Sequence, residues 1–484
     1  MATPRFKFPE GELDRWIVIG DVTEGSVRVW ARDPSGPITA QLSIDGEVVA
    51  STKIETSPKH DHVGAAALTI DPAQPGVAFE VSAGGMTRQG RFAPAPGSRA
   101  TFTFAFGSCH QPFTEALAGG FVAQHAGAAI YPTIGRLLSE REAAFALWLG
   151  DQVYSDGIAN VDIRRRMAAD STITDADLLD TYRHLYRGYF NEAGYRRMAE
   201  SLPAYLMWDD HDIFDGWGSL LDYSDFDHRV YRAAEIAYRE YQHLRNPGGA
   251  LDAEAPYGYS FWYGDVGFHV PDLRSGRDFH SGRVMADEGW DRLDAFLDEA
   301  SRRGVPTVFL AISVPVVHAS PALMRSLERI RLSFGRDVRD RWSVTNFAPE
   351  RTKLLERIFA WQSAAECRQV IVLSGDVHVG AAFTVKPRHG HGRFRQWTSS
   401  ALSTPDGLKH VLANRLITKY VRLGEQELRV WRRGLATSNN VGLVSVEPAV
   451  DGGHLVRLDV YEYDAHGDSL AVGLSDVARP SKSV

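Results

Sequence analysis

The chain has 484 residues, of which 44% are hydrophobic and 24% charged, a composition typical of soluble globular proteins and long enough for about two to four domains. Its formal net charge of -8 excludes the basic surface that draws proteins to nucleic acid, and it is too small to indicate disorder. The two cysteines, Cys109 and Cys367, are too few for a disulfide framework and favour a reducing compartment.

The sequence shows neither an export signal nor a membrane span. The N-terminal stretch MATPRFKFPEGELDRW has no apolar segment behind a basic start and no twin arginine. The longest apolar stretch, VPTVFLAISVPVVHA, is interrupted by prolines and is shorter than the ~20 residues that a membrane helix needs. We expect a cytoplasmic protein, although a leader removed during maturation would leave no trace in this sequence.

The first part of the chain, over about 16–92, alternates hydrophobic and polar residues, as in SVRVWARD, ITAQLSID and VAFEVSAGG. This period, punctuated by turn residues, predicts a small antiparallel β-sandwich similar to a fibronectin III or immunoglobulin domain. The proline- and glycine-rich segment RFAPAPGSRA then predicts a linker with a boundary near Ser98. We therefore expect one domain over 1–98 and a second over 99–484.

Beyond the linker, apolar strands alternate with helical stretches, which predicts α/β layering. A helical insert with aromatic and arginine-rich faces is expected over about 155–260, and strands return in the C-terminal tail. The strands expected in between are FTFAFGS (102–108), FALWLG (145–150), YLMW (205–208), GFHVPDL (267–273), TVFLAISVPVV (307–317) and VIVLSG (370–375).

Four of these strands are followed by residues of the types that serve as metal ligands in proteins. In open α/β sheets, ligands gather just beyond the C-terminal ends of the strands. Several carboxylates cannot stay ionised together in a low-dielectric crevice without a compensating cation, so this recurrence predicts a site for multivalent metal ions. The groups that follow the strands are Cys109-His110, Asp151 to Tyr154, Asp209 to Asp212, and Asp376 with His378.

Each motif alone has an ordinary structural explanation. An aspartate after a strand-end glycine is often a turn or a helix cap, Cys109 could be a small buried side chain, and His378 could be a hydrogen-bonded core histidine. For LMWDDHDIFDGWG, at 206–218, the alternative is a solvated acidic loop, but the aromatic residues between the acids favour a buried one. The repetition at successive strand ends favours the metal site over these alternatives.

The series Ser108-Cys109, LGDQVY, WDDHD and SGDVHVG resembles the signature of the PhoD-like phosphatases, also called alkaline phosphatase D, within the calcineurin-like metallophosphoesterases. LGDQVY is similar to the family's Gly-Asp-x-x-Tyr, WDDHD stands where the superfamily has Gly-Asn-His-Glu, and GDVH where it has Gly-His-x-His. GFHVPDLRSGR resembles a further family segment. The resemblance runs from about residue 15 to the C-terminus. It implies a calcineurin-like αββα sandwich of two mixed sheets flanked by helices, behind an N-terminal β-sandwich.

The resemblance also implies a multinuclear metal site, with Cys109 and Tyr154 matching the cysteine and tyrosine of the PhoD branch. Thiolate and phenolate suit ferric iron, so we expect ferric iron with calcium, and manganese, zinc or magnesium as alternatives. Asp151 is the expected bridging carboxylate. The expected iron ligands beside it are Cys109, Tyr154 and His378. The expected ligands on the calcium side are drawn from Asp209, Asp210 and Asp376, where either of the adjacent pair could face the metal.

Three more residues are expected to act on the substrate. His211 stands where the superfamily histidine protonates the leaving group, and Asp212 is its expected orienter. Arg274, with Arg277 as the alternative, is expected to bind the non-bridging phosphate oxygens, although either could form an ordinary ion pair.

The chain departs from the family pattern in two places. Asp215-Gly216 stands where many members have an Asn-Asn pair, so a calcium ligand could be exchanged or missing. His318 resembles the histidine that precedes the last motif in the superfamily, but a structural histidine at the start of a helix would account for the same sequence.

We therefore expect a metal-dependent phosphoric ester hydrolase that acts on small phosphomonoesters or phosphodiesters with a metal-activated water. Two alternatives stay open at this stage. The same site could hydrolyse phosphotriesters or phospholipid headgroups, or the chain could be a non-catalytic metal-containing binding protein.

Overall fold

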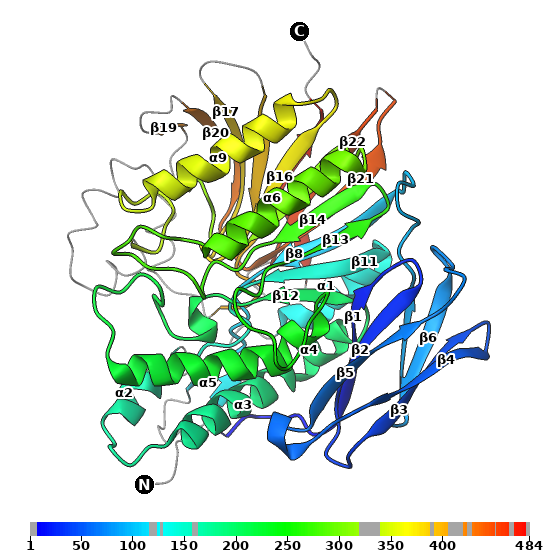
Figure 1. Ribbon diagram of the computed structural model, residues 1–484, viewed down its shortest axis with the longest axis vertical. Helices are drawn as coiled ribbons and strands as arrows, with labels where there is room; N and C mark the ends of the chain where they lie inside the picture. The colour runs from blue at the N-terminus through cyan, green and yellow to red at the C-terminus, as the bar shows by residue number, and fades with distance from the viewer. Residues whose placement is uncertain are drawn as a thin grey trace.

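The computed structural model describes residues 7–115, 123–125, 129–156, 163–318, 339–387, 392–404, 420–423, 428–450, 452–463 and 469–480. Its first part is a pair of antiparallel sheets, blue in Figure 1, whose facing sides enclose a core that includes Ile17, Val29, Leu42 and Val81. One sheet has the order β1-β2-β5, from Trp16–Val22, Ser26–Arg32 and Val63–Thr69. The other has the order β4-β3-β6-β7, from Glu47–Ile54, Ile38–Ile44, Ala78–Ala83 and Met86–Arg91, and the short helix η1 spans Pro58–His60.

The outer face of the three-stranded sheet packs on the helical region of the chain. The Arg245 guanidinium lies 4.4 Å from the ring centre of Trp30 and 5.0 Å from that of Trp16. Trp30 Nε1 also donates a hydrogen bond of 2.7 Å to the carbonyl of Glu240. Both tryptophans are fully buried, so this sheet is covered on both faces. The expected domain boundary near Ser98 stays a prediction.

The rest of the chain is built on two larger mixed sheets. The six-stranded sheet has the order β12-β11-β8-β21-β22-β23, from Ala204–Met207, Ala143–Leu149, Phe102–Gly107, Asn440–Pro448, His454–Tyr463 and Leu470–Ala478. The eight-stranded sheet has the order β13-β14-β15-β16-β18-β17-β20-β19, from Tyr259–Tyr263, Val266–Val270, Thr307–Ile312, Gln369–Ser374, Phe394–Thr398, Gly380–Pro387, Leu428–Ala436 and Tyr420–Leu423. A small hairpin joins β9 (Phe113–Glu115) and β10 (Ala123–His125).

The two large sheets pack face to face through aromatic side chains. Phe104 of β8 lies edge-on to Phe268 of β14 and to Phe309 of β15, with ring centres 5.3 and 5.2 Å away. All three rings are fully buried. Strands buried on both faces read as continuous apolar runs, which is why TVFLAI of β15 lacks a period-two alternation.

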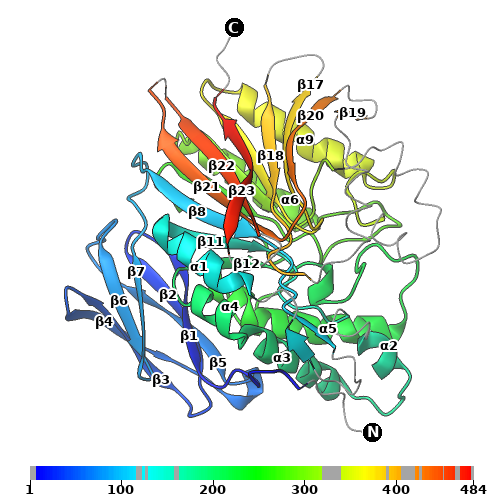
Figure 2. The ribbon, with the colours of Figure 1, turned by 180° about the vertical axis from the view of Figure 1, so that it is seen from behind.

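Helices cover the outer faces of both sheets. In Figure 1, α6 and α9 lie in front of the eight-stranded sheet, and they contact β14 and β16. Figure 2 shows α1 and α4 on the other side, where α1 contacts β11. The layer order is therefore helix, sheet, sheet, helix, which confirms the expected α/β fold. Within the described residues, the helices of this part of the chain are α1 (Ile130–Glu140), α2 (Ile163–Ala168), α3 (Asp175–Phe190), α4 (Ala193–Ala199), η2 (Asp210–Asp212), α5 (Asp225–Tyr241), η3 (His243–Arg245), α6 (Asp287–Arg302) and α9 (Ala348–Ser363).

The helices α2 to α5 and η3, with the strand β12 among them, lie within the range 155–260 where a helical insert is expected, and the bounds of that insert stay a prediction. The pair α3 and α5 packs side by side, at the bottom of Figure 1. Capping boxes begin both helices, with Thr174 accepting from the backbone of Asp177 and Ser224 from that of Asp227. Among the described residues, no helix combines the length and the apolar character needed to cross a membrane.

Candidate metal centre

The C-terminal ends of β8, β11 and β16 meet at one place, where the backbones of the two sheets come together. The Cys109 amide donates to the Gly150 carbonyl at 3.2 Å, and the Asp376 amide donates to Ser108 Oγ at 3.0 Å. A Cβ at Gly375 would lie 2.3 Å from Ser108 Oγ and 2.9 Å from the Leu149 carbonyl oxygen. Only glycine fits there, so Gly375 allows the two sheets to bring their strand-end side chains together.

Four of the expected ligands have left-handed backbone conformations. The φ angle is 61° at Cys109, 55° at Asp151, 67° at Asp376 and 54° at His378. This region is disfavoured for residues with a Cβ, and such conformations gather at functional sites, where the surrounding structure holds them. Their occurrence at successive strand ends supports a functional role for the cluster.

Cys109, Asp151, Tyr154 and His378 lie together. Asp151 Oδ2 accepts hydrogen bonds from Cys109 Sγ at 3.2 Å and from the Tyr154 hydroxyl at 3.3 Å. The Tyr154 hydroxyl is 3.4 Å from His378 Nε2. Ser400 Oγ donates to Cys109 Sγ at 3.1 Å and accepts from the His378 amide at 3.1 Å. The four side chains expected on the iron side therefore form one connected group.

The other acidic residues form two overlapping groups next to it. Ligand atoms of Asp209, Asp210 and Asp376 all lie within 4.8 Å of one another, and so do those of Asp151, Asp210 and His211. Asp210 belongs to both groups, so the two positions adjoin. Both members of the Asp209-Asp210 pair therefore face the cluster.

Buried carboxylate oxygens without partners support a fit to metal ions. Asp151 Oδ1 and Asp209 Oδ2 are buried and have no hydrogen-bond partner in the described part of the chain, and Asp376 Oδ2 contacts Arg341 without hydrogen-bond geometry. Buried carboxylate oxygens without partners are costly, and a bound cation satisfies them. Oxygen ligands with a thiol and a phenol nearby form a donor set that suits a mixed site for hard and softer cations.

Electrostatics support the same conclusion. Burial raises the pKa of Asp151 well above its ordinary value, with the charges of Asp210 and Asp209 adding to the effect. Burial and the Asp151 charge likewise raise the pKa of the Cys109 thiol and, with Cys109, of the Tyr154 phenol. These raised pKa values favour the protonated forms in the absence of a cation, so metal binding here would release protons.

His211 is oriented by Asp156 and not by Asp212. His211 Nδ1 lies 2.6 Å from Asp156 Oδ1, which leaves Nε2 as the nitrogen available to the cluster. The His211 ring stacks on Tyr154, with ring centres 4.3 Å apart. Burial lowers the pKa of His211, but the carboxylates of Asp156, Asp210 and Asp151 outweigh it and raise that pKa well above its ordinary value.

Asp212 instead accepts hydrogen bonds from the backbone, so its expected role as the orienter of His211 is wrong. Its Oδ1 accepts from the Gln152 amide at 3.1 Å and the Val153 amide at 3.3 Å, and its Oδ2 from the Asp209 amide at 2.8 Å. This carboxylate therefore connects the loops after β11 and β12. Burial raises the pKa of Asp212 to about 7.

Arg274 is also not placed as expected. It is fully buried, and each of its N–H groups has an acceptor. Nε pairs with Asp209, Nη1 donates to the Trp217 carbonyl and to Asp340, and Nη2 donates to Asp340 at 2.8 Å and Asp210 at 3.3 Å. All of its N–H donors bind acceptors within the protein, so no donor is left for phosphate. Arg274 instead positions Asp209 and Asp210.

Arg277, the alternative to Arg274, is equally buried. Its Nε donates to Ser219 Oγ at 3.2 Å and pairs with Asp340 at 3.2 Å. Burial raises the pKa of Asp340, and the charges of Arg274 and Arg277 outweigh this effect and lower it. The three residues therefore form a buried ion-pair network behind the cluster.

The two departures from the family pattern can be placed as well. Among the described residues, neither Asp215 nor His318 belongs to a candidate metal group. The Asp215 amide donates to Asp156 Oδ2 at 2.6 Å, and the Gly216 amide donates to Asp210 Oδ2 at 2.8 Å. The Asp215-Gly216 turn thus holds Asp210 and Asp156 through its backbone.

Sequence reasoning missed Asp156, Asp340 and Arg341. Asp156 lies within LGDQVYSD, five positions after Asp151, and its polar neighbours gave it no distinguishing signal. Arg341 forms an ion pair with Asp376, yet it belongs to no motif. Nothing in the sequence around Asp340 and Arg341 marks them as parts of the site.

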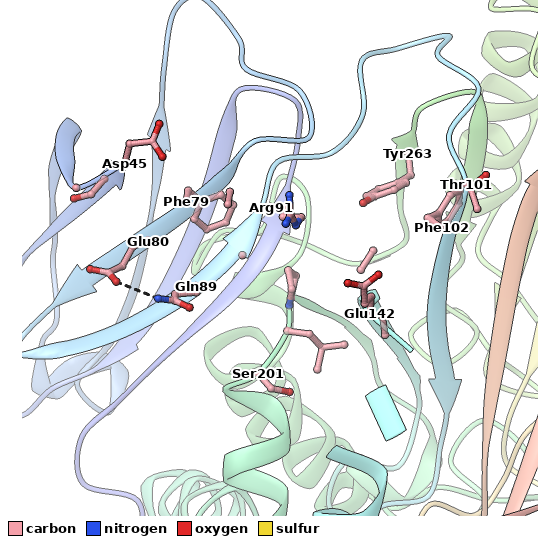
Figure 3. A pocket seen from close by; sticks show the side chains of 18 residues that line it. Asp45, Phe79, Glu80, Gln89, Arg91, Thr101, Phe102, Glu142, Ser201 and Tyr263 are labelled. Carbon is pink, nitrogen blue, oxygen red and sulfur yellow. Dashed lines mark hydrogen bonds between the residues drawn. The ribbon is translucent and has the colours of Figure 1, made fainter. Parts of the chain in front are cut away.

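A groove of about 770 Å³ opens at the opposite ends of β8 and β11, between them and the β-sandwich (Figure 3). Thr101, Phe102 and Glu142 line it from the large sheet, and Glu80 and Gln89 line it from the sandwich. Gln89 Nε2 donates to Glu80 at 3.3 Å. None of the expected site residues lines this groove, so it is separate from the metal centre.

Residues 104–303 match the PhoD-like phosphatase family. The sequence has no match among curated proteins. The fold is similar to a solved structure described as PhoD, with 17% identity, a TM-score of 0.68, and coverage of 98% of this chain and 91% of that one. It is also similar to the purple acid phosphatase PPD1 of yellow lupin (Lupinus luteus), with 11% identity, a TM-score of 0.56, and coverage of 97% and 74%.

Proposed function

Because residues 104–303 belong to the PhoD-like phosphatase family, we propose that the protein is a metal-dependent phosphoric ester hydrolase acting on phosphodiesters and phosphomonoesters. The observation that carries the proposal is the cluster at the strand ends. It brings together four carboxylates, a thiol, a phenol and two imidazoles, and three of its buried carboxylate oxygens have no hydrogen-bond partner among the described residues.

The residues divide into two sets of ligands. Cys109, Tyr154 and His378 are proposed to hold ferric iron, because thiolate and phenolate stabilise a trivalent ion. Asp209, Asp210 and Asp376 are proposed to hold calcium, which prefers oxygen ligands. Asp151 lies between the sets: its Oδ2 contacts Cys109 and Tyr154, while a ligand atom of it lies within 4.8 Å of one of Asp210. This position supports its role as the bridging carboxylate.

Two cations bound in these adjoining positions would supply an activated water and would neutralise charge on the oxygens of an in-line displacement at phosphorus. His211 is proposed to donate a proton from Nε2 to the leaving oxygen. Asp156 holds Nδ1 and thereby fixes the ring orientation and the tautomer. The neighbouring carboxylates, Asp156 first, raise the pKa of His211, which favours the protonated form of this donor.

The test combines elemental analysis with chromogenic esters. We expect the purified protein to contain iron and calcium, to absorb visible light through a thiolate- or phenolate-to-iron transition, and to hydrolyse bis-p-nitrophenyl phosphate and p-nitrophenyl phosphate. Asp151→Asn should lose at least about 10³-fold in activity and part of its metal. Asp291→Asn, an exposed aspartate on α6, is the matched control and should match the wild type.

Two outcomes would reject the proposal. One is a metal-loaded protein that hydrolyses none of these esters, which would favour a binding protein. The other is an Asp151→Asn variant with near-wild-type activity, which would place the chemistry elsewhere.

A further inference from the structure

Two arginines contact the acidic cluster, and they differ in how fully their donors are used. Arg274 is fully buried and has an acceptor for each N–H group. The side chain of Arg341 is 17% exposed, and its Nη1 forms an ion pair with Asp376 Oδ2. Among the described residues, neither Nε nor Nη2 of Arg341 has a hydrogen-bond acceptor. Arg341 is therefore partly exposed and has N–H donors to spare, unlike Arg274.

The partner of Arg341 is itself a candidate metal ligand. Arg341 contacts Asp376 Oδ2, a buried oxygen that receives no hydrogen bond from the described residues. Asp376 also shares a candidate metal group with Asp209 and Asp210. A cation held by this carboxylate would compete with the guanidinium for the same oxygen. Arg341 would then be left beside the metal with its N–H groups unused.

Arg341 lies near a histidine as well as near the acidic cluster. His318 is half-buried, and its pKa is lowered to about 3 by burial and by the charges of Arg341 and Arg432. Arg341 thus carries a positive charge next to the candidate metal ligand Asp376. A phosphate group fits beside such a side chain, because guanidinium binds phosphate oxygens through a planar pair of N–H donors.

We propose that Arg341 binds the non-bridging oxygens of the substrate's phosphate group and so restricts the site to esters that carry at least one negative charge. This inference rests on the proposed function and deepens it, since it selects anionic monoesters and diesters over neutral triesters. It assigns to Arg341 the role that the sequence assigned to Arg274.

The first test measures binding without catalysis. Calorimetric titration of inorganic phosphate into the metal-loaded full-length protein should show binding that weakens at least about 10-fold in Arg341→Gln. Arg341→Lys keeps the charge and loses the planar fork, so it should recover part of the affinity. Metal content should not fall in either variant. The Arg341 guanidinium competes with the metal ion for Asp376, so replacing it removes or weakens that competition. Arg302→Gln, a 72% exposed arginine on α6, is the matched control and should bind phosphate like the wild type.

The second test separates charge recognition from a structural role. Arg341→Gln should lower kcat/KM for p-nitrophenyl phosphate and its diester by about 10²-fold, mostly through KM. Binding of the uncharged diethyl p-nitrophenyl phosphate, as substrate or as inhibitor, should not change. Arg274→Gln should instead lose metal, because it leaves Asp209 and Asp210 without their partner.

The outcomes are distinct. Unchanged phosphate affinity in Arg341→Gln overturns the inference. An equal loss of kcat/KM for charged and uncharged esters, together with loss of metal, also overturns it. Either result would indicate that the Arg341–Asp376 ion pair is purely structural. A wild type that binds phosphate with Arg341-dependent affinity but hydrolyses no ester would keep the inference and reject the proposed function.

Discussion

The two ends of strands β8 and β11 are built differently, although both open onto polar surroundings. At the C-terminal end, acidic side chains are buried, the backbone is left-handed at Cys109 and Asp151, and Asp151 Oδ1 lacks a hydrogen-bond partner among the described residues. At the N-terminal end, the groove in Figure 3 contains polar side chains such as the hydrogen-bonded Glu80 and Gln89. The volume of a cavity is thus a poorer guide to chemistry here than unsatisfied, buried charge.

The close backbone contact at the C-terminal end gives the largest expected effect. Gly375→Ala would place a Cβ 2.3 Å from Ser108 Oγ and push the two sheets apart. We predict a loss of about 1–3 kcal/mol in the free energy of unfolding and at least about 10²-fold in activity, because the ligands would be misplaced. Chemical denaturation, elemental analysis and the diester assay measure the three effects.

Gly135→Ala on α1 is the matched control. The nearest atoms to its added Cβ are those of Met198 at 3.9 Å, an ordinary contact, and alanine favours the helix. Stability should stay equal or rise. A Gly375→Ala protein with full metal content and activity would show that the close approach is not needed.

The next prediction concerns Asp156, which is hydrogen-bonded to His211, the proposed proton donor. Asp156→Asn removes the negative charge from His211 Nδ1, so the pKa of His211 should fall and the alkaline limb of the pH-rate profile should move to lower pH. We expect kcat to fall about 10-fold with metal content unchanged. If Asp212→Asn moved the alkaline limb and Asp156→Asn did not, the assignment of Asp156 would be wrong.

The strand ends could be predicted from the sequence because their signals are local. An apolar run followed by glycine and a carboxylate, as in LWLGD or VLSGD, fixes both the strand and the residue that follows it. The wrong predictions for Asp212 and Arg274 have the opposite origin. Adjacent carboxylates look alike in sequence, and the acceptors of a guanidinium come from segments distant along the chain, here Asp209, Trp217 and Asp340.

The pH dependence of stability offers a smaller test at the same end of the strands. Burial raises the pKa of Asp212 from 3.8 to about 7 in the folded protein, so folding favours its protonated form. Its contribution to stability is therefore present below about pH 4 and is lost as the pH rises to about 7. Denaturation of the metal-free protein at several pH values should show this loss, and Asp212→Asn should remove it.

Asp212→Asn should also cost about 1–3 kcal/mol at low pH, because the amide cannot accept all the backbone N–H groups that the carboxyl group binds. An unchanged pH dependence in this variant would mean that another group carries the titration.

The smallest effects are expected at the N-terminal end. Glu142 and Glu80 line the groove but are exposed, so replacing either by glutamine removes a solvated charge and leaves no buried atom unpaired. Each variant should change stability by less than about 0.5 kcal/mol and leave hydrolysis of the diester within about two-fold of wild type. Glu142 is an informative position because it directly precedes β11, and Asp151 follows the other end of the same strand. A large loss of activity in Glu142→Gln, with metal content unchanged, would mean that the two ends of this strand are energetically coupled. The groove could then not be treated as independent of the metal centre.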